Sequence, residues 1–520
     1  MSASQPENPN DLSERIISRD RASLLGNVTL AVSGQGAAFI GGLLAMIVTA
    51  RLLGPDGYGR LAMFFLVLAV FSQVLVSWQN TGLVRFGREE MARSGRVRET
   101  FGAALLLFLV NLGVAAGIVF LFRERLGAYL NIGPAACLLL LIYLALNEAV
   151  QLFRALFQTI SAFRAYAAAA FLIRPLNLVF IVCVFVLLAK PADAAGILKA
   201  HLASISVVLL MCAVVATRRP EAGVGVGGKK NVRRVAAYAW PLMLAGLWVL
   251  VVDWVDLALI RHYRPAVEVG WYAAAYQPLT VLGHLRIAGT AAVLPLLVSF
   301  AAAKRFATLE WSLDELLPQI AWATGIGGAL AAAGVELIPL VLGAKYAPAV
   351  EPCRILMIAA ACSCVAVFFE AMARAMDRVG MTVLVLAAVA ATNVALDVVL
   401  IPRIGIAGGA VATSVAFGAS LAVYLSCFNR IEELGRATAR RVWIPLGIAP
   451  PIVCAIIASN LRNGPLRAAC CLAVVAAALL AARTGRVFRR ETLDKLQNVR
   501  MPDMARSALH RVYRIMDPSR

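Results

Sequence analysis

The stretch from Ala239 to Leu297 decides the fold; it reads AWPLMLAGLWVLVVDWVDLALI, then RHYRPAVEVG, then WYAAAYQPLTVLGHLRIAGTAAVLPLL. Each apolar part is about 20 residues long, enough to cross a bilayer as a helix. The first part nevertheless contains Asp253 and Asp256, and the second contains His284 and Arg286. Ionisable groups at membrane depth are costly unless they face a bundle interior or a watery cavity. We therefore expect these two helices to line a transport pathway.

The composition places the rest of the chain in the membrane as well. Of the 520 residues, 61% are hydrophobic and only 15% are charged, and the mean hydropathy is +0.80. A soluble protein of this size has no means of covering so much apolar surface, so the predicted fold class is an all-α polytopic membrane protein. The formal net charge of +20 resides mainly in the loops between apolar segments, so no nucleic acid partner is expected.

Neither a cleaved leader nor a metal site is indicated. Residues 1–23 are polar and lack the apolar core of a secretory signal peptide. The ten cysteines lie almost entirely inside apolar segments without Cys-x-x-Cys spacing, so they are interpreted as packing residues. The four histidines form no pair with ligand spacing. We expect no metal and no cofactor.

Fourteen segments are apolar enough to be transmembrane helices. They cover residues 24–48, 61–82, 101–122, 135–157, 167–189, 194–216, 239–260, 273–297, 316–342, 355–376, 382–401, 405–428, 442–459 and 466–482. The last two are short, so a count of twelve is the alternative.

The basic residues predict the orientation. With the N-terminus in the cytoplasm, 34 of the 49 lysines and arginines fall on the cytoplasmic side and 11 on the other. Because cytoplasmic loops carry the excess of positive charge, both termini are predicted to be cytoplasmic and the number of spans even.

The predicted organisation has six parts. They are a cytoplasmic N-terminal segment (1–23), a six-helix lobe (24–216), a basic cytoplasmic linker (217–238), a second six-helix lobe (239–428), two extra helices (429–482) and a basic cytoplasmic tail (483–520). The linker is glycine-rich, which is typical of a flexible connection. The tail either lies along anionic lipid headgroups or is solvated.

Short matches recur between the two lobes at a nearly constant offset of about 210 to 220 residues. Arg154-Ala155-Leu156 matches Arg374-Ala375-Met376, Asn177 matches Asn393, Ala195-Gly196 matches Ala407-Gly408, and the turn Ala50-Arg51 with Gly57-Tyr58 matches Ile260-Arg261 with Gly270-Trp271-Tyr272. An even number of spans in each lobe makes the repeat parallel, which is the architecture of rocking carriers with a site between their halves.

Several stretches together resemble bacterial polysaccharide flippases of the multidrug/oligosaccharidyl-lipid/polysaccharide exporter superfamily. TARLLGPDGYGRLAMFF is followed by NTGLVRFGREE in the first lobe, and VGWYAAAYQP, PLVLGAKYAPAVEPCRIL and NVALDVVLIPRIGIAGGAVATSVAFG follow in the second. The resemblance covers roughly residues 20–430, and the last two helices and the tail are generic.

This resemblance implies a V-shaped bundle with a central cavity. Members carry a lipid-linked oligosaccharide, usually a repeat unit on undecaprenyl pyrophosphate, from the cytoplasmic to the periplasmic leaflet of the bacterial inner membrane. The implied role is in exopolysaccharide or lipopolysaccharide export, beside a polysaccharide polymerase and chain-length machinery. Membrane lipids surround the protein, and H⁺ or Na⁺ is a candidate coupling ion.

Arg286 is the first candidate for binding the pyrophosphate, because a guanidinium offers a planar fork to phosphate oxygens. The alternative is a structural ion pair with Asp253 or Asp256. Arg85, at the cytoplasmic mouth, is a second candidate, although an arginine there also anchors the topology. The remaining substrate candidates are Arg51, Asn80, Gln35 and Trp248, for which anchoring, helix packing and aromatic packing are the alternatives.

Asp253, Asp256 and His284 are candidates for ion coupling, because acidic residues carry H⁺ or Na⁺ in many secondary transporters. An interhelical polar contact is the alternative, and it suits Asp256 better because this residue lies nearer the outer end of its helix. His284 is also consistent with simple packing. Further acidic residues within spans each need a polar partner; these are Glu148, Glu336, Glu370 and Asp397.

Two other functions compete with a lipid-linked oligosaccharide flippase. A multidrug or cation antiporter of the same superfamily is the nearer alternative, but the arginine among the acids favours an anionic cargo. A membrane enzyme of polysaccharide assembly would need an extensive extracytoplasmic loop, and none of the predicted outer loops exceeds about 15 residues. No phosphate-binding loop of an ATPase is present, so the chain is predicted to be a transporter and not an enzyme.

The asymmetry of the basic residues generates a prediction of topology. In cysteine-accessibility labelling, cysteines placed at Lys229 and in the C-terminal tail should react from the cytoplasmic side. Cysteines at Lys190 and Lys345 should react from the periplasm. A periplasmic C-terminus would overturn both the orientation and the even number of spans.

Overall fold

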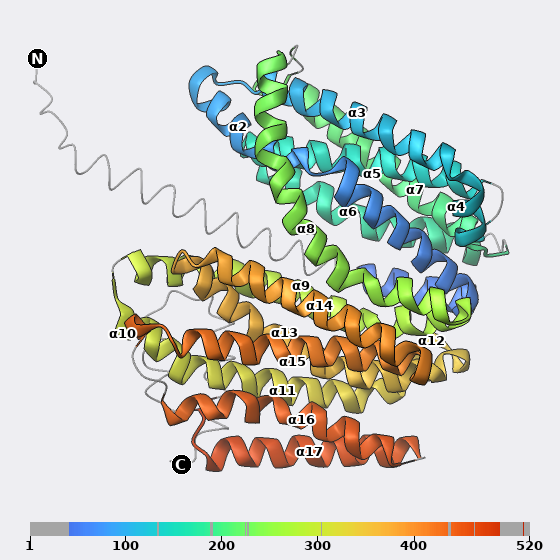
Figure 1. The fold of residues 1–520 in the computed structure, drawn as a ribbon. Coiled ribbons are helices and arrows are strands. Elements are labelled where there is room, and N and C mark those ends of the chain that lie inside the picture. Colours follow the sequence, from blue (N-terminus) through green and yellow to red (C-terminus); the bar gives the residue numbers. More distant parts are fainter. Residues whose placement is uncertain are drawn as a thin grey trace, which may run out of the picture. The chain divides into compact units, whose positions relative to one another are not determined.

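A computed structural model describes residues 41–132, 135–187, 191–223, 225, 228–302, 304–434, 438–461, 463–488 and 513. These residues are almost entirely helical (Figure 1). A bilayer offers no hydrogen-bond partners to the backbone, so an apolar chain of this kind satisfies its N–H and C=O groups within helices. The predicted all-α membrane fold is therefore confirmed.

The helices follow one another with short connections. The first described helix, Gly41–Val76, ends in the π-helical turn η1 (Ser72–Val76). In the first half it is followed by α2 (Gln79–Ser94), α3 (Glu99–Leu121), α4 (Arg123–Leu130), α5 (Ala136–Thr159), α6 (Phe163–Ile181), η2 (Val182–Leu187) and α7 (Ala194–Thr217). In the second half come α8 (Lys229–Tyr263), α9 (Ala266–Ala302), α10 (Phe306–Trp311), η3 (Ser312–Leu316), α11 (Leu317–Gly334), η4 (Val335–Leu337), α12 (Ile338–Leu342), η5 (Ala344–Ala349), α13 (Val350–Ala375), α14 (Val379–Ile404), α15 (Ile406–Phe428), η6 (Glu432–Leu434), η7 (Ala439–Val442), α16 (Trp443–Ser459) and α17 (Gly464–Thr484).

Eleven helical stretches within the described residues are long and apolar enough to cross a membrane. The two short C-terminal segments form helices of spanning length, in the stretches Ala439–Ser459 and Gly464–Thr484, while one helix, Gly41–Val76, covers parts of the two predicted spans 24–48 and 61–82. The helices α8 and α9 are 35 and 37 residues long and extend beyond the predicted spans 239–260 and 273–297 at both ends. Both continue through the positions of their prolines, Pro241, Pro278 and Pro295. The chain is thus a multi-pass membrane protein.

The described chain divides into two compact units. Unit 1 comprises the described parts of Met1–Leu52 and Val67–Leu244, and unit 2 those of Leu53–Leu66 and Ala245–Arg520. In unit 1, α5 packs against α2, α3 and α7, and α6 packs against α7. In unit 2, α13 packs against α9, α11 and α15, and α14 packs against α15. The contacts of α5 in unit 1 correspond to those of α13 in unit 2, and the α6–α7 contact corresponds to the α14–α15 contact. A parallel internal repeat requires this correspondence.

Two segments predicted as repeat-related turns are helical, in Gly41–Val76 and at the start of α9, and they meet inside unit 2 through backbone atoms. A Cβ atom on Gly270, in the first turns of α9, would overlap the carbonyl oxygen of Pro55. A Cβ on Gly59 would lie 2.5 Å from the carbonyl oxygen of Ala266. The amide of Gln277 also donates a hydrogen bond to the Tyr58 hydroxyl at 3.3 Å. Glycine is needed at Gly59 and Gly270 because only a residue without a side chain permits this approach.

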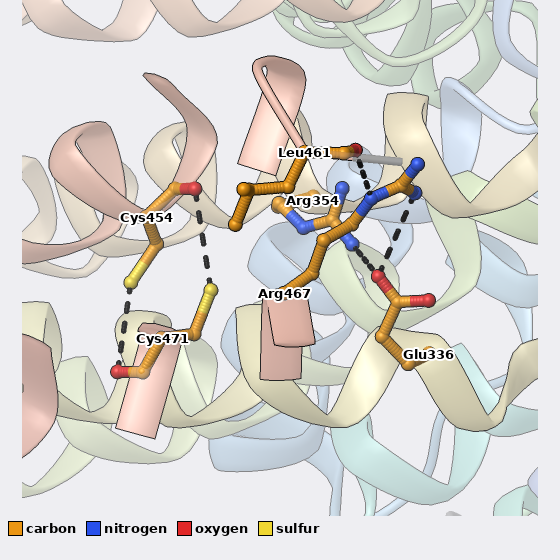
Figure 2. A network of polar contacts seen from close by, with 6 residues as sticks. All are labelled: Glu336, Arg354, Cys454, Leu461, Arg467 and Cys471. Atoms are coloured by element: carbon orange, nitrogen blue, oxygen red, sulfur yellow. Dashed lines mark hydrogen bonds and ion pairs between the residues drawn. The ribbon is translucent and has the colours of Figure 1, made fainter. Parts of the chain in front are cut away.

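The C-terminal helix α17 is fixed to unit 2 by charged groups, which Figure 2 shows. Glu336 accepts a hydrogen bond from the buried Arg354 of α13, and Arg467 of α17 lies 3.8 Å from the same carboxylate oxygen. Arg467 also donates to the carbonyl oxygen of Leu461 at 2.7 Å. Nearby, the thiols of Cys454 and Cys471 each face the backbone carbonyl oxygen of the other (Figure 2). All ten cysteines are free, consistent with their interpretation as packing residues.

The turn before α3 is held by a carboxylate. The side chain of Glu90 accepts hydrogen bonds from the backbone N–H groups of Arg98, Glu99 and Thr100 at 2.8 to 2.9 Å. Burial acts to raise the pKa of Glu90, whereas these hydrogen bonds and one from the Thr100 side chain act to lower it. The combined effect of the hydrogen bonds is larger, so the pKa lies below its ordinary value. The carboxylate therefore stabilises unit 1 at neutral pH, and this contribution is lost as the pH falls through the lowered pKa.

Part of the predicted linker 217–238 is attached to the same turn. The N–H of Val97 donates to the carbonyl oxygen of Glu221 at 2.8 Å, and the N–H of Gly225 donates to that of Arg98 at 3.0 Å. From Lys229 onward the chain is already helical, in α8. The described part of this segment is therefore packed against unit 1.

We predict that Gly270→Ala destabilises the protein, because the new methyl group would displace the backbone of Pro55. Overpacking of this kind costs about 1–3 kcal/mol. Thermal unfolding of the purified protein in detergent, followed by tryptophan fluorescence, should show a lowered midpoint.

Gly117→Ala is the matched control, because Gly117 lies in α3 with nothing within 4 Å of an added Cβ. This change should be neutral or stabilising by up to about 1 kcal/mol. An equal loss in both variants would show that the Gly270 contact is not special.

Candidate functional site

Four helices of unit 2 bring polar side chains together in its interior. Asp256 comes from α8, Tyr272 from α9, Asn393 and Asp397 from α14, and Thr413 from α15. We call these five residues the Asp256 cluster. Asn393 and Asp397 are four residues apart and therefore share one face of α14. None of the five side chains is more than 3% exposed.

Hydrogen bonds connect the cluster. The Asn393 amide donates to Asp256 Oδ1 at 2.7 Å and to Asp397 Oδ2 at 2.9 Å. The Thr413 hydroxyl donates to Asp256 Oδ2 at 2.6 Å, and the Tyr272 hydroxyl donates to the same oxygen. The Asn393 amide thus connects the two carboxyl groups. The Tyr272 ring fits because Gly409 has no side chain and lies against it.

Two oxygen atoms of the cluster, Asn393 Oδ1 and Asp397 Oδ1, are buried and have no hydrogen-bond partner among the described residues. A buried acceptor without a donor is costly, so its presence calls for an explanation such as an ion or a proton. Two carboxyl groups this close cannot both stay charged without compensation. The donor set of carboxylate, amide and hydroxyl oxygens suits a hard cation, and a shared proton would meet the same need. Among the described residues no group of three or more His, Cys, Asp and Glu is placed to hold a metal ion.

The two predicted acids of α8 lie in different surroundings. Asp256 is 3% exposed and belongs to the cluster, whereas Asp253 is exposed and lies outside it. The sequence predicts that Asp256 either couples an ion or makes an interhelical polar contact. It makes interhelical polar contacts, and the same contacts place oxygen atoms where an ion could bind.

Arg85 lies on α2 with its guanidinium stacked on aromatic rings. The guanidinium carbon is 4.2 Å from the centre of the Tyr238 ring and 5.4 Å from that of Phe86. Arg234 covers Phe86 at 4.2 Å and pairs with Glu89 at 2.5 Å. Arg85 itself is exposed and pairs with no carboxylate within the described part of the chain, and stacking of a guanidinium on a ring uses its face and not the N–H groups at its edge. That edge is able to donate to a phosphate.

The other described candidates are not members of the Asp256 cluster. Arg51 is exposed on the first helix, and Trp248 is 40% exposed on α8. Asn80, at the start of α2, is half-buried, and its side-chain oxygen has no partner among the described residues.

Three candidates lie beyond what the structure describes. Gln35 is outside the described residues. Arg286 and His284 lie on α9, whose backbone is described there, but their side chains are not.

The partners expected for the remaining acids are present. Glu148 accepts a hydrogen bond from Ser72, and Asp397 accepts one from Asn393. Glu336 is bonded to Arg354, and Glu370 is bonded to Arg374 one turn further along α13. The expectation that an acid within a span finds a polar partner is confirmed for all four.

Several solved structures share this fold. A lipid II flippase, MurJ in an inward closed conformation, matches with a TM-score of 0.64 and 12% identity over 89% of this chain and 100% of that one. An inward-facing multidrug resistance MATE transporter matches with a TM-score of 0.63 and 14% identity over 79% and 100%. A MOP superfamily transporter from Pyrococcus furiosus matches with a TM-score of 0.53 and 14% identity over 79% and 95%. No curated protein matches in sequence.

The fold is therefore shared with these membrane transporters. The sequence model of the family described as polysaccharide biosynthesis protein matches residues 24–301. The chain belongs to this family, which confirms the resemblance found in the sequence.

The sequence did not identify Tyr272 and Thr413 as site residues, and it treated Asn393 only as a repeat position. The spacing of Asn393 and Asp397 on one face of an apolar helix was the available signal. Thr413 and Tyr272 gave none, because each is common in membrane helices as a packing residue.

Proposed function

We propose that the protein is a flippase that moves a lipid-linked oligosaccharide, a repeat unit on undecaprenyl pyrophosphate, from the cytoplasmic to the periplasmic leaflet. The observation that carries the proposal is the family match together with the transporter fold. One solved structure with this fold is named a lipid II flippase.

Charge supports an anionic cargo. Arg85 presents a guanidinium whose face is stacked on Tyr238, which does not use the N–H groups at its edge. We propose that Arg85 collects the pyrophosphate on the cytoplasmic side and that Arg286, well inside both ends of α9, holds it during transfer. Arg51, Asn80, Gln35 and Trp248 remain proposed contacts to the cargo.

Asp256 is proposed to take part in ion coupling, with Asp253 and His284 as further candidates. The cluster offers two buried carboxyl groups and two unpartnered oxygens, which H⁺ or Na⁺ would satisfy. If the ion binds one conformation of unit 2 better than the other, its binding energy shifts the equilibrium between them. The carrier would then use the ion gradient instead of ATP.

A multidrug antiporter is the alternative within the superfamily, because MATE transporters share the fold. The family match and the cationic Arg85 favour the lipid-linked glycan. An enzyme of polysaccharide assembly is disfavoured, because MurJ and the MATE transporter, which share this fold, are a flippase and a transporter.

Deletion of the gene should leave repeat units attached to their lipid at the cytoplasmic face while surface polysaccharide disappears. This is expected because the step removed is translocation and not synthesis. A membrane-impermeant probe measures on which side the glycolipid lies. In the deletion strain the probe should reach the glycolipid in opened cells but not in intact cells. Transfer of sugar from a nucleotide donor by the purified protein would instead favour the enzyme.

Arg286→Lys should lower export of polysaccharide about tenfold in a deletion strain, because a lysine keeps the charge but loses the two-pronged contact, worth about 1.4 kcal/mol. Arg286→Ala should abolish export with a normal amount of protein in the membrane. Normal export by Arg286→Ala, or recovery of folding only when Asp253→Asn is added, would make Arg286 a structural partner.

Na⁺ should raise the thermal stability of the purified protein if the Asp256 cluster binds it. A ligand at 100 times its Kd stabilises by about 2.7 kcal/mol. Asp397→Asn should remove the effect of Na⁺, and Glu351→Gln, at an exposed position of α13, should keep it. K⁺ at equal ionic strength is the control. Stability that depends on pH but not on Na⁺ would identify the ion as a proton.

A further inference from the structure

Unit 1 contains a buried acid that the proposed function does not use. Glu148 lies at the middle of α5, a helix of 24 residues that is long and apolar enough to span the membrane. Its side chain is only 2% exposed. With about 18 Å of helix on either side, the carboxyl group is close to the centre of the bilayer.

The hydrogen bonds of Glu148 are one-sided. Its Oε1 accepts from the Ser72 hydroxyl at 2.6 Å and from the Asn147 amide at 2.9 Å. Its Oε2 is buried and has no hydrogen-bond partner among the described residues. A carboxylate would leave half of its negative charge on this bare oxygen, which is strongly unfavourable at membrane depth. A neutral acid fits, with Oε1 as the carbonyl oxygen and the proton on Oε2.

The charged and titratable groups nearby have other contacts. On α5, α6 and α7 these groups include Tyr143, Arg154, Tyr166, Arg174, Lys199, His201 and Cys212. The Tyr143 hydroxyl is 3.4 Å from His201, and Arg154 donates to Gln151 at 2.7 Å. Arg174 packs against Gly42, and Lys199 is exposed. No cation pairs with Glu148 in the described structure, and its two partners do not titrate.

The partner Ser72 begins a π-helical turn. In η1 the N–H of Ser77 donates to the carbonyl oxygen of Ser72, five residues earlier, at 2.9 Å. Single π-helical turns inside α-helices occur often at functional sites. A return of this turn to α-helical hydrogen bonding would rotate Ser72 and move its hydroxyl away from Glu148.

We propose that Glu148 is a proton-binding site of unit 1, protonated on Oε2 in this state and able to release the proton to water when η1 rearranges. In release the O–H bond of the acid breaks, the electron pair stays on Oε2, and water takes the proton. The site is separate from the Asp256 cluster, which belongs to unit 2. It rests on the geometry of Glu148 and not on the identity of the cargo.

Infrared difference spectroscopy tests the proposal on the full-length protein in lipid nanodiscs, without any glycolipid. Raising the pH should remove the carbonyl-stretch band of one carboxylic acid that is present in wild type and absent in Glu148→Gln. Glu124→Gln, at an exposed position of α4 in the same unit, is the matched control and should keep the band. Comparison of the variants separates this band from those of Asp256 and Asp397.

Ser72→Ala provides a second measurement that does not depend on replacing the acid. The carbonyl oxygen of the protonated acid loses a donor, so the same band should move to higher frequency. Identical spectra of Glu148→Gln and wild type, an unchanged band in Ser72→Ala, or a band that persists at every pH at which the protein stays folded would overturn the proposal. A band removed by Na⁺ at constant pH would also overturn it, since the site would then bind a cation.

Discussion

The absence of hydrogen-bond partners in a bilayer governs the interior of this protein. Each polar group placed within a span must find a partner within the protein, or carry an ion or a proton. The Asp256 cluster, the Glu148 carboxyl and the Glu336–Arg354 pair are three responses to that requirement. Because each one connects different helices, these contacts also determine which helices pack together.

At repeat-related positions, the two units provide different hydrogen-bond partners for a buried asparagine. Asn393 of α14 bonds two acids, whereas its repeat counterpart Asn177 of α6 lies 2.7 Å from the imidazole nitrogen of His201. Both asparagines retain a buried side-chain oxygen without a partner among the described residues. The repeat has therefore preserved a polar position in the fifth helix of each lobe, while the chemistry around it has diverged.

Much of the fold was predictable, because apolar length and charge asymmetry are local properties of the sequence. The spans from α3 to α7 and from α11 to α17 follow directly from them. The site was less predictable, since burial depends on which face of a helix meets its neighbours. Asp253 and Asp256 look alike in the sequence, yet only Asp256 is enclosed. Thr413 gives no signal at all, and its importance becomes visible only where α15 meets α8.

The stacking of Arg85 has a consequence for the anion binding proposed for this residue. A free arginine loses much rotational freedom on binding, and immobilising such a side chain costs about 0.5–1.5 kcal/mol. The Arg85 guanidinium already lies over the Tyr238 ring, 4.2 Å from its centre, before any ligand arrives. The Arg85 side chain loses part of its conformational entropy when the protein folds. The further loss on binding a phosphate is therefore smaller. Replacing Tyr238 with an aliphatic residue would thus weaken anion binding while leaving the charge of the site unchanged.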